Sequence, residues 1–510
     1  MKAVRVRFAP SPTGALHIGG VRTALYNYLL AKKTNGTMIL RIEDTDQTRF
    51  VPGAEEYIKE SLAWVGIKID EGAGVGGSHE PYRQSERKTI YKEYAQKLLD
   101  GGYAYYAFDS SEELEAMRNR LKAAGSSNQQ YSAATRLTMN NSLTLSKDEL
   151  KKKLERGDPY VIRLSVPADE EIHLNDLIRG DVKVNSSQID DKVLMKSDGM
   201  PTYHLANVVD DYLMKISHVI RGEEWLPSAP LHVLLYRFLG WENDMPQFAH
   251  LPLLLKPDGN GKLSKRDADQ MGFPIFPLNW TDPNTNELAK GFRESGYLPE
   301  ALINFLAFLG WNPGTEQELF SINELIEAFS IDRIGKAGAR FDIQKAQWFN
   351  QQYLKAKTNE ELSVYLLESL AKENIDCLKE KATKICSVMK DRVTFTQDFW
   401  MQGKFFFEAP TAYDEQVVKK KWNDDAIEVL TAFRHSVSQS TKLTAETAKA
   451  TLESVTASLG IGTGKILQAL RVSVTGGASG PDLMMTMEIL GSPEVVKRID
   501  HALNTLKKTV

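Results

Sequence analysis

The sequence predicts an α/β protein in which a parallel sheet with helical crossovers is followed by an all-helical region. Three observations favour this fold class. Short apolar strands alternate with helical patterns over residues 1–108, the same alternation returns over 196–270, and helical spacing dominates over 351–510. A chain of 510 residues also exceeds what one hydrophobic core supports, which indicates several domains.

The first predicted strand and helix enclose a loop with two prolines, three glycines and one histidine, RFAPSPTGALHIGG at residues 7–20. Apolar residues alternate with arginines over residues 4–8 and recur at helical spacing over 21–29. Glycines let a ligand approach the backbone, a helix start offers free N–H groups to an anion, and His17 adds a donor. The loop therefore predicts a phosphate site, with an ordinary tight turn as the alternative.

The later elements follow the same patterns. Strands are predicted at 37–44, 160–166 and 215–222, and helices at 53–65, 86–100, 111–124, 146–157 and 298–310. Residues 109–195 interrupt the α/β alternation with mixed structure and a polar loop, so they are predicted to form an insertion.

A cationic motif, GKLSKRDAD at 261–269, places Lys262, Lys265 and Arg266 beside glycines. Lysines three residues apart on a mobile loop suit a polyphosphate whose negative charge grows during a reaction. A solvated surface loop is the alternative interpretation.

Two further motifs place polar residues at the ends of predicted strands. RIEDTD at 41–46 offers carboxylates for an ammonium group or a metal, although a turn or helix cap is the expected role of Asp46. SDGMPTYHLANVVDD at 197–211 precedes a strand that ends at Arg221, where open α/β sheets bind ligands. For His204 in this motif, the alternative is a half-buried histidine with a purely structural role.

Together and in this order, PSPTGALHIGG, RIEDTD, PTYHLANVVDD and KLSKR resemble the motifs of the glutamyl-tRNA synthetases, which are class I aminoacyl-tRNA synthetases. HIGG stands at the position of the family's HIGH motif and KLSKR at that of its KMSKS motif. The resemblance implies ATP-dependent formation of glutamyl-adenylate and transfer of glutamate to the 3′-terminal adenosine of tRNA(Glu). ATP, L-glutamate, Mg²⁺ and tRNA(Glu) are therefore the implied ligands and partners.

The resemblance also implies a domain organisation. Residues 1–108 and 196–270 would form the two halves of a Rossmann-like catalytic domain, and 109–195 an inserted domain that binds the acceptor end of tRNA. Residues 271–350 would contact the tRNA stem, and 351–510 would form an all-α anticodon-binding region.

Site residues carry over to matching positions of this chain. His17 and Lys265 are the implied catalytic residues. The implied ATP-binding residues are Pro10, Ser11, Thr13, Gly14, His17, Gly19, Gly20, Lys262, Ser264, Lys265 and Arg266. The implied glutamate-binding residues are Arg7, Ala9, Ser11, Glu43, Tyr203, Asn207 and Arg221. The two arginines in this set match the two carboxylates of glutamate, without an assignment of one to the other.

The chain departs from the family pattern in three places. Gly20 stands where the general class I motif has its second histidine, a variation compatible with the glutamyl enzymes. Some members hold zinc through cysteines in the insertion, whereas this chain has Ala107 and Asp109 there, in AYYAFDSSEEL. Its two cysteines, Cys377 and Cys386, form no CxxC pattern, so no metal site and no zinc are expected. An extra stretch at 270–290 follows KLSKR; its composition predicts an ordered loop, with no assigned function.

Composition limits the remaining possibilities. The net charge of −4 predicts no global attraction to nucleic acid, so tRNA contacts must use local faces. No apolar run approaches the roughly 20 residues of a membrane helix, and the N-terminus has no signal-peptide core, so a cytoplasmic protein without a membrane partner is expected. A monomer is also expected, although the sequence itself does not reveal the oligomeric state. VVKKKW at 417–422 is a candidate basic-aromatic patch, although a solvated helix face is preferred.

Four alternatives remain open. They are a shortened paralogue that glutamylates a modified nucleoside, a glutaminyl-tRNA synthetase, a small-metabolite nucleotidyltransferase and a non-catalytic RNA-binding protein. The long helical tail argues against the first two, and KLSKR with the intact site residues argues against the others. The sequence does not reveal whether tRNA(Gln) is also charged.

Overall fold

Two compact units make up the computed structural model, which describes residues 3–126 and 128–506. The first unit comprises Met1–Glu294 and Pro299–Ile343, and the second comprises Ser295–Leu298 and Gln344–Val510. The α/β pattern of the sequence lies in the first unit and the helical pattern in the second, which confirms the predicted fold class.

Two parallel sheets lie edge to edge in the first unit. One has the order β3-β2-β1 and the other β9-β10-β6-β7, with only β7 antiparallel to its neighbour. The Ser217 N–H donates to the Arg5 carbonyl at 2.9 Å, so β1 and β9 are neighbours. The strands are β1 (Arg5–Phe8), β2 (Thr37–Leu40), β3 (Glu71–Gly72), β6 (Glu171–Asp176), β7 (Gly180–Asn185), β9 (His218–Gly222) and β10 (Gln247–Leu251). The strand order therefore reverses direction at β1, and such switch points form a crevice at the carboxyl ends of the strands.

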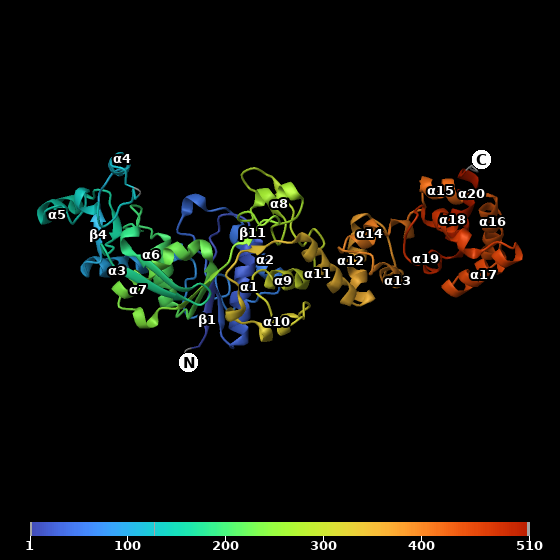
Figure 1. The fold of residues 1–510 in the computed structure, drawn as a ribbon, viewed down its shortest axis with the longest axis horizontal. Helices are drawn as coiled ribbons and strands as arrows, with labels where there is room; N and C mark the ends of the chain where they lie inside the picture. Colours follow the sequence, from blue (N-terminus) through green and yellow to red (C-terminus); the bar gives the residue numbers. More distant parts are fainter. Residues whose placement is uncertain (1–2, 127, 507–510) are drawn as a thin grey trace. The chain divides into compact units, whose positions relative to one another are not determined.

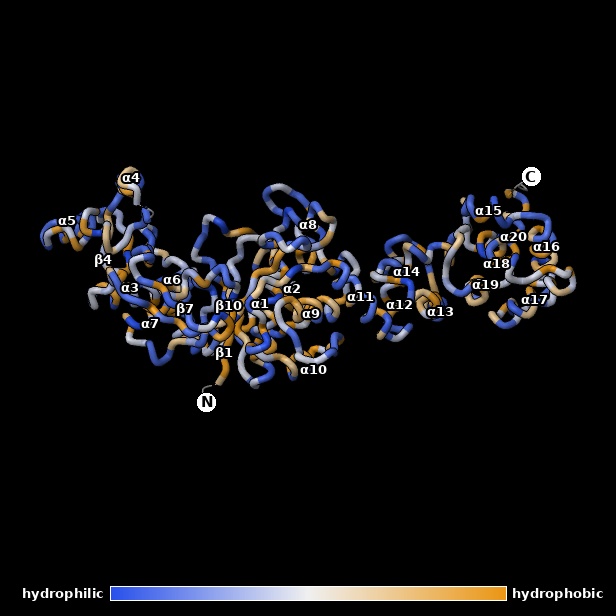
Figure 2. Tube along the Cα trace, viewed as in Figure 1, coloured by the Kyte–Doolittle hydropathy of each residue, from blue (hydrophilic) through white to orange (hydrophobic). Residues whose placement is uncertain are grey.

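Helix α1 (Ile18–Lys33) packs between the parallel sheet and two later helices of this unit. Val21, Leu25 and Leu29 are fully buried, because β1, β2 and β9 pack on one side of α1 and α9 and α10 on the other. Figure 2 shows the hydrophobic residues of β1, β10 and α9 in this interior. The other helices here are α2 (Ala54–Trp64), α3 (Lys88–Asp100), α6 (Tyr203–Leu213), α7 (Ala229–Phe238), α9 (Pro299–Ala307) and α10 (Ile322–Ala328).

A separate antiparallel sheet, β4-β5-β8, joins two strands of the insertion to β4 (Ala104–Ala107), which lies just before residue 109. The other elements of this part are α4 (Ser111–Ala123), α5 (Lys147–Arg156), β5 (Val161–Leu164) and β8 (Val193–Met195). Ser110 and Ser146 begin the two helices with capping boxes, which the patterns SSEE and SKDE encode. Strand β6, from within the same 109–195 segment, pairs instead with β10 of the parallel sheet, and β7 pairs with β6.

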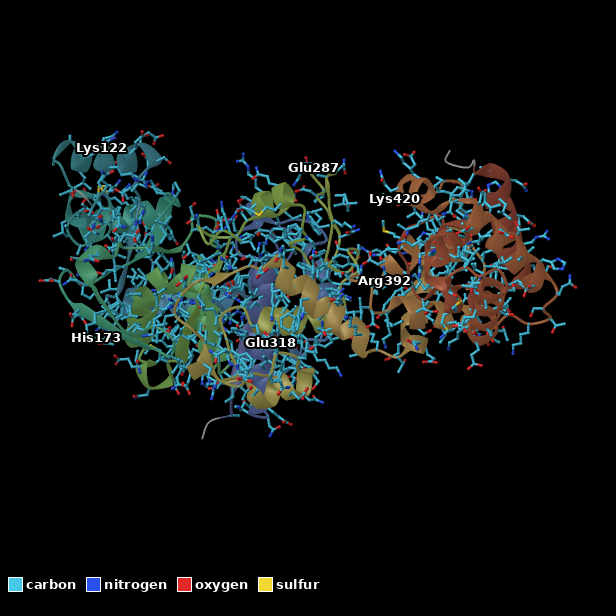
Figure 3. The ribbon with its side chains drawn as sticks, turned by 45° about the vertical axis from the view of Figure 1, so that its right-hand side comes forward. Lys122, His173, Glu287, Glu318, Arg392 and Lys420 are labelled. Carbon is cyan, nitrogen blue, oxygen red and sulfur yellow. The ribbon has the colours of Figure 1, made fainter. Side chains whose placement is uncertain are left out.

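The extra stretch after KLSKR is ordered, as its composition predicts. It follows α8 (Lys265–Met271) and ends in a hairpin of β12 (Trp280–Thr281) and β13 (Leu288–Ala289), with Glu287 exposed near its turn (Figure 3). Two short strands, β11 (Leu254–Leu255) and β14 (Ala339–Arg340), pair beside the KLSKR loop. The buried side chains of Ile275 and Leu278 anchor the stretch to the unit's core.

Within the described part of the second unit, all regular elements are helices. They are α11 (Ile343–Ala356), α12 (Asn359–Lys372), α13 (Lys379–Met389), α14 (Asp398–Met401), α15 (Glu415–Lys421), α16 (Asp424–Ser438), α17 (Ala445–Ser458), α18 (Thr463–Thr475), α19 (Leu483–Leu490) and α20 (Ser492–Thr505). Cys377 and Cys386 are both free thiols. None of the helices among the described residues is long and apolar enough to cross a membrane.

The VVKKKW segment forms α15 and its C-terminal cap. Trp422 is only 2% exposed and packs in the core of the second unit with Val417, whereas Lys419 is exposed and Lys420 points to solvent (Figure 3). The basic-aromatic patch is therefore wrong, because the aromatic ring is unavailable for stacking on a base. The solvated helix face is confirmed.

Candidate active site

A cavity of about 360 Å³ lies where the carboxyl ends of β1 and β9 meet the loop before α1. Every implied site residue lines this cavity except Ser264, Lys265 and Arg266. The lining members of that set are Arg7, Ala9, Pro10, Ser11, Thr13, Gly14, His17, Gly19, Gly20, Glu43, Tyr203, Asn207, Arg221 and Lys262. The fold thus gathers four sequence motifs around one space.

His17 is the N-cap of α1, and its Nδ1 accepts the Gly19 N–H at 3.0 Å. A neutral imidazole whose Nδ1 is an acceptor carries its proton on Nε2. Burial, with a contribution from Lys262, lowers the pKa of His17 to about 4, so the ring is neutral near pH 7. Its Nε2 is buried and has no hydrogen-bond partner among the described residues. His17 therefore offers a hydrogen-bond donor to a ligand, not a positive charge.

The start of α1 differs from the sequence-based expectation of free N–H groups. Ile18 N–H donates to the Ile275 carbonyl at 3.0 Å, and Gly20 N–H donates to the His17 carbonyl at 2.8 Å. With Gly19 bound to the His17 ring, the first N–H groups of the helix are all occupied. The side chain of His17, rather than the backbone, is the donor left for an anion.

Glu43 presents a fixed carboxylate to the cavity. Its Oε1 accepts from Arg41 at 2.9 Å and from Asn207 at 3.0 Å, which leaves Oε2 as the oxygen available to a ligand. Arg41 also donates to Asp211 at 2.7 Å. Such a carboxylate, oriented by two donors, suits the ammonium group of a ligand.

Arg7 is held by a carboxylate of the protein itself. Its Nε and Nη2 donate to Asp211 at 3.0 and 3.3 Å. Burial alone would raise the pKa of Asp211, but Arg7 and Arg41 hold that pKa below its usual range. The charge of Arg7 is thus largely compensated, and among the described residues only its Nη1 lacks a hydrogen bond.

Arg221 differs from Arg7 in this respect. It is 5% exposed, its Nε donates to His250 Nε2 at 3.0 Å and its Nη1 donates to the Tyr203 hydroxyl at 2.8 Å. Within residues 3–126 and 128–506, no carboxylate lies within ion-pairing distance of its guanidinium. A buried cation without a counter-ion is costly, so this wall of the cavity favours an anionic ligand.

Tyr203 and Trp225 complete this wall. Their rings lie 4.2 Å apart, and burial raises the pKa of Tyr203 to about 12, which keeps its hydroxyl protonated. Trp225 lines the cavity together with Glu224 and Arg22, three residues that the sequence did not single out. The sequence EEWL at 223–226 lies just after Arg221 and could have indicated Glu224 and Trp225, whereas Arg22 is one of many polar residues on a helix.

The KLSKR motif is divided between the cavity and the following helix. Lys262 lines the cavity and its Nζ lies 3.1 Å from Glu224. Ser264 is instead the N-cap of α8 and shares a capping box with Asp267. Lys265 and Arg266 form the first turn of α8, outside the cavity lining.

Two structural alternatives from the sequence are confirmed. Asp46 caps the short helix Gln47–Arg49 by accepting the Thr48 N–H. His204 is half-buried, lies 3.3 Å from His232 and does not line the cavity. Neighbouring Asp44 accepts two hydrogen bonds from Ser85, at 2.8 and 2.6 Å.

The buried histidines make stability depend on pH. Burial lowers the pKa of His17 and His204 to about 4, below the 6.5 or so of an unfolded chain. The unfolded state therefore binds more protons as pH falls from about 6.5 to about 4, and the free energy of unfolding drops by up to about 1.4 kcal/mol per pH unit for each group. Thermal unfolding midpoints at pH 7.5 and 5 should show this loss, and His204→Gln should reduce it.

His435 on α16 provides the control for this experiment, because it is exposed and no carboxylate of the described residues pairs with it. His173, exposed on β6 (Figure 3), is unsuitable because its Nε2 lies 2.6 Å from Glu171. His435→Gln should keep the wild-type dependence of the midpoint on pH. Equal slopes for wild type and His204→Gln would contradict the assignment.

Comparison with known proteins identifies the family. The family described as tRNA synthetases class I (E and Q), catalytic domain, matches residues 3–348. The chain belongs to this family. A second family, the anticodon binding domain, matches residues 349–503.

Relatives of this synthetase chain match it over their full length. A glutamate–tRNA ligase of Cytophaga hutchinsonii is 63% identical over 100% of this chain and 99% of the relative, and one of Amoebophilus asiaticus is 58% identical over 99% of both. The crystal structure of a glutamate tRNA ligase from Elizabethkingia meningosepticum, in complex with its amino acid, has a TM-score of 0.96 at 51% identity and covers 99% of this chain and 100% of its own. The class I catalytic domain and the helical anticodon-binding region inferred from the sequence are thereby confirmed.

Proposed function

We propose that the protein is a glutamate–tRNA ligase, which activates L-glutamate with ATP and transfers it to the terminal adenosine of tRNA(Glu). The observation that carries this proposal is the composition of one cavity. It combines an uncompensated buried cation at Arg221, a fixed carboxylate at Glu43 and a neutral donor at His17. These groups match, in turn, a carboxylate, an ammonium and a phosphate.

The geometry supports an assignment for the substrate's two carboxylates. The α-carboxylate must attack the α-phosphate of ATP, and a carboxylate clamped by a buried guanidinium is a poor nucleophile. Arg221 and Tyr203 therefore bind the side-chain carboxylate, while Glu43 binds the α-ammonium. The α-carboxylate then remains free to face ATP on the His17 side of the cavity.

The ATP half of the site works by positioning and by stabilising charge. His17 Nε2 donates to a phosphate oxygen, and the backbone around Gly14, Gly19 and Gly20 lines the adenosine side. Lys262 and Lys265 neutralise the departing pyrophosphate. Enzymes of this family use ATP together with Mg²⁺. The phosphate oxygens of ATP would hold the ion, and its positive charge would offset the negative charge of the phosphates. Glu224, on the cavity wall, offers a carboxylate oxygen, the kind of ligand that Mg²⁺ prefers.

The remaining domains are assigned to tRNA. The match of residues 349–503 to an anticodon-binding domain supports contact between the second unit and the anticodon end of tRNA(Glu). We assign residues 109–195 to the acceptor end and 271–350 to the stem. As an enzyme of translation, it is proposed to act as a monomer in the cytoplasm.

Amino-acid activation and tRNA charging test this function. Pyrophosphate exchange with ATP should depend on glutamate, measured with and without tRNA(Glu), and tRNA(Glu) should be charged. A preference for glutamine would instead support a glutaminyl-tRNA synthetase, and exchange without charging of any tRNA would support a nucleotidyltransferase. Parallel charging of tRNA(Gln) shows whether the enzyme accepts both tRNAs.

We propose that the insertion folds without zinc. Where cysteines would bind the metal, Asp109 accepts from the Asn140 N–H at 2.7 Å and from the Tyr131 hydroxyl at 3.0 Å. Ala107 lies in a buried apolar cluster with Met117 and Met139. Because hydrogen bonds and apolar packing already join these segments, purified protein should contain far less than one zinc per chain by elemental analysis. About one zinc per chain, lost together with activity on chelation, would contradict this.

A further inference from the structure

A buried hydrogen-bonded chain leads from the interior of the parallel sheet to Arg221. Arg221 Nε donates to His250 Nε2 at 3.0 Å, and His250 Nδ1 lies 2.6 Å from Asp176 Oδ2. The three residues end or occupy adjacent strands β9, β10 and β6, and Arg221 and His250 are direct partners in the strand register. His250 and Asp176 are 0% and 1% exposed, and neither lines the cavity.

The donors in this chain determine the state of His250. A guanidinium Nε always donates, so His250 Nε2 must be an unprotonated acceptor. The proton of the neutral ring is then on Nδ1, from which it is donated to Asp176. Asp176 also accepts the N–H groups of Ile178 and Arg179 at 2.9 and 2.8 Å, which fixes the carboxylate itself.

Arg7 and Arg221, the two arginines implied to bind glutamate, are thus held in different ways. Asp211 binds Arg7 directly and compensates its charge. Arg221 is instead held by a neutral ring, which separates its guanidinium from the charge of Asp176. A neutral acceptor fixes the orientation of a guanidinium but leaves most of its charge for a ligand.

We propose that His250, oriented by Asp176, is a positioning residue that holds Arg221 in place to bind the side-chain carboxylate of glutamate. This inference rests on the proposed function, and it makes His250 a determinant of the preference for glutamate over glutamine. Without the acceptor at Nε2, a buried Nε–H of Arg221 would lose its partner and the side chain would reorient. Arg179, which donates to the backbone carbonyl of His250 and pairs with Glu223, cannot replace this partner, because a guanidinium has no hydrogen-bond acceptor.

The test uses two substitutions of His250 that differ in reach. Asn at this position can keep the hydrogen bond to Asp176 but is too short to accept from Arg221, whereas Gln can place an amide oxygen near the original Nε2. His250→Asn should weaken glutamate binding and raise the KM for glutamate by roughly 10- to 100-fold, as expected for one hydrogen bond to a charged group. kcat and the KM for ATP should change little, and His250→Gln should recover much of the loss.

A third variant tests the tautomer. Asp176→Asn has the same shape, but its amide would donate to His250 Nδ1 and move the ring proton to Nε2, so that two donors would face each other at Arg221. It should raise the KM for glutamate as His250→Asn does. His218→Asn on the neighbouring strand, at a half-buried histidine bonded to Ser217, is the matched control and should leave every constant unchanged.

Glutamate binding by calorimetry and pyrophosphate exchange with glutamate and with glutamine provide the readouts, with melting temperatures to monitor folding. The proposal is supported if the preference for glutamate falls in His250→Asn and Asp176→Asn and is rescued in His250→Gln. Unchanged binding, or an equal loss in kcat, ATP affinity and melting temperature for all variants, would overturn it. If the wild-type protein itself neither binds nor activates glutamate, the proposed function fails instead.

Discussion

Replacing Arg221 with leucine should lower kcat/KM for glutamate by on the order of 10²–10³, the cost of removing one partner from a buried charge pair. The loss should appear mainly in the KM for glutamate, because Arg221 binds the carboxylate that does not react. Activation of glutamine, weak in the wild type, should change far less, so the preference between the two amino acids should shrink. Pyrophosphate exchange with each amino acid measures all three effects.

Two features of Arg221 make this expectation specific. The guanidinium has no carboxylate partner among the described residues, so leucine removes a cation whose charge the fold leaves uncompensated. Arg221→Lys keeps the charge but loses the planar fork that reaches His250 and Tyr203 at once, and it should recover only part of the activity. Comparable kcat/KM values for glutamate and glutamine in the wild type would contradict the role given to Arg221.

The sequence predicted the local elements well because their patterns are local. Alternating residues gave β1, and the glycine-rich loop and helical spacing after it gave α1, which begins at Ile18. The order of the motifs then identified the cavity wall from Arg7 to Arg221, since the ends of parallel strands converge at a switch point.

Local sequence patterns cannot predict contacts between segments that lie far apart in the chain. The helix start appeared free in the sequence, but Ile275, which lies in the extra stretch after KLSKR, supplies a carbonyl to Ile18. Similarly, the neutral support of Arg221 depends on the register between β9 and β10, which brings His250 opposite it. A histidine in the sequence QFAHL shows no local sign of that role.

Lys265 differs from the other implied site residues because it lies outside the cavity lining. It begins α8 at the end of a loop in which Gly259 and Gly261 have φ of 82° and 89°, conformations that glycine adopts without strain. Such a loop can close on bound ATP. We therefore expect Lys265 to contact the pyrophosphate only as the transition state forms, when negative charge moves onto the leaving group. A contact made in the transition state rather than in the ground state acts on kcat.

Lys265→Ala should therefore lower kcat for adenylate formation by on the order of 10²–10³, the usual cost of losing one donor to developing charge. The KM for ATP should change much less, and binding of tRNA should stay near the wild-type value. His17→Ala should slow the same step, and the double variant should lose less than the product of the two effects, because both donors serve one charge.

Lys290→Ala, which removes an exposed lysine from the nearby hairpin, is the matched control and should keep the wild-type rate. Stopped-flow measurement of adenylate formation decides the matter: a wild-type rate in Lys265→Ala would leave KLSKR as a surface loop and remove the main support for loop closure over ATP.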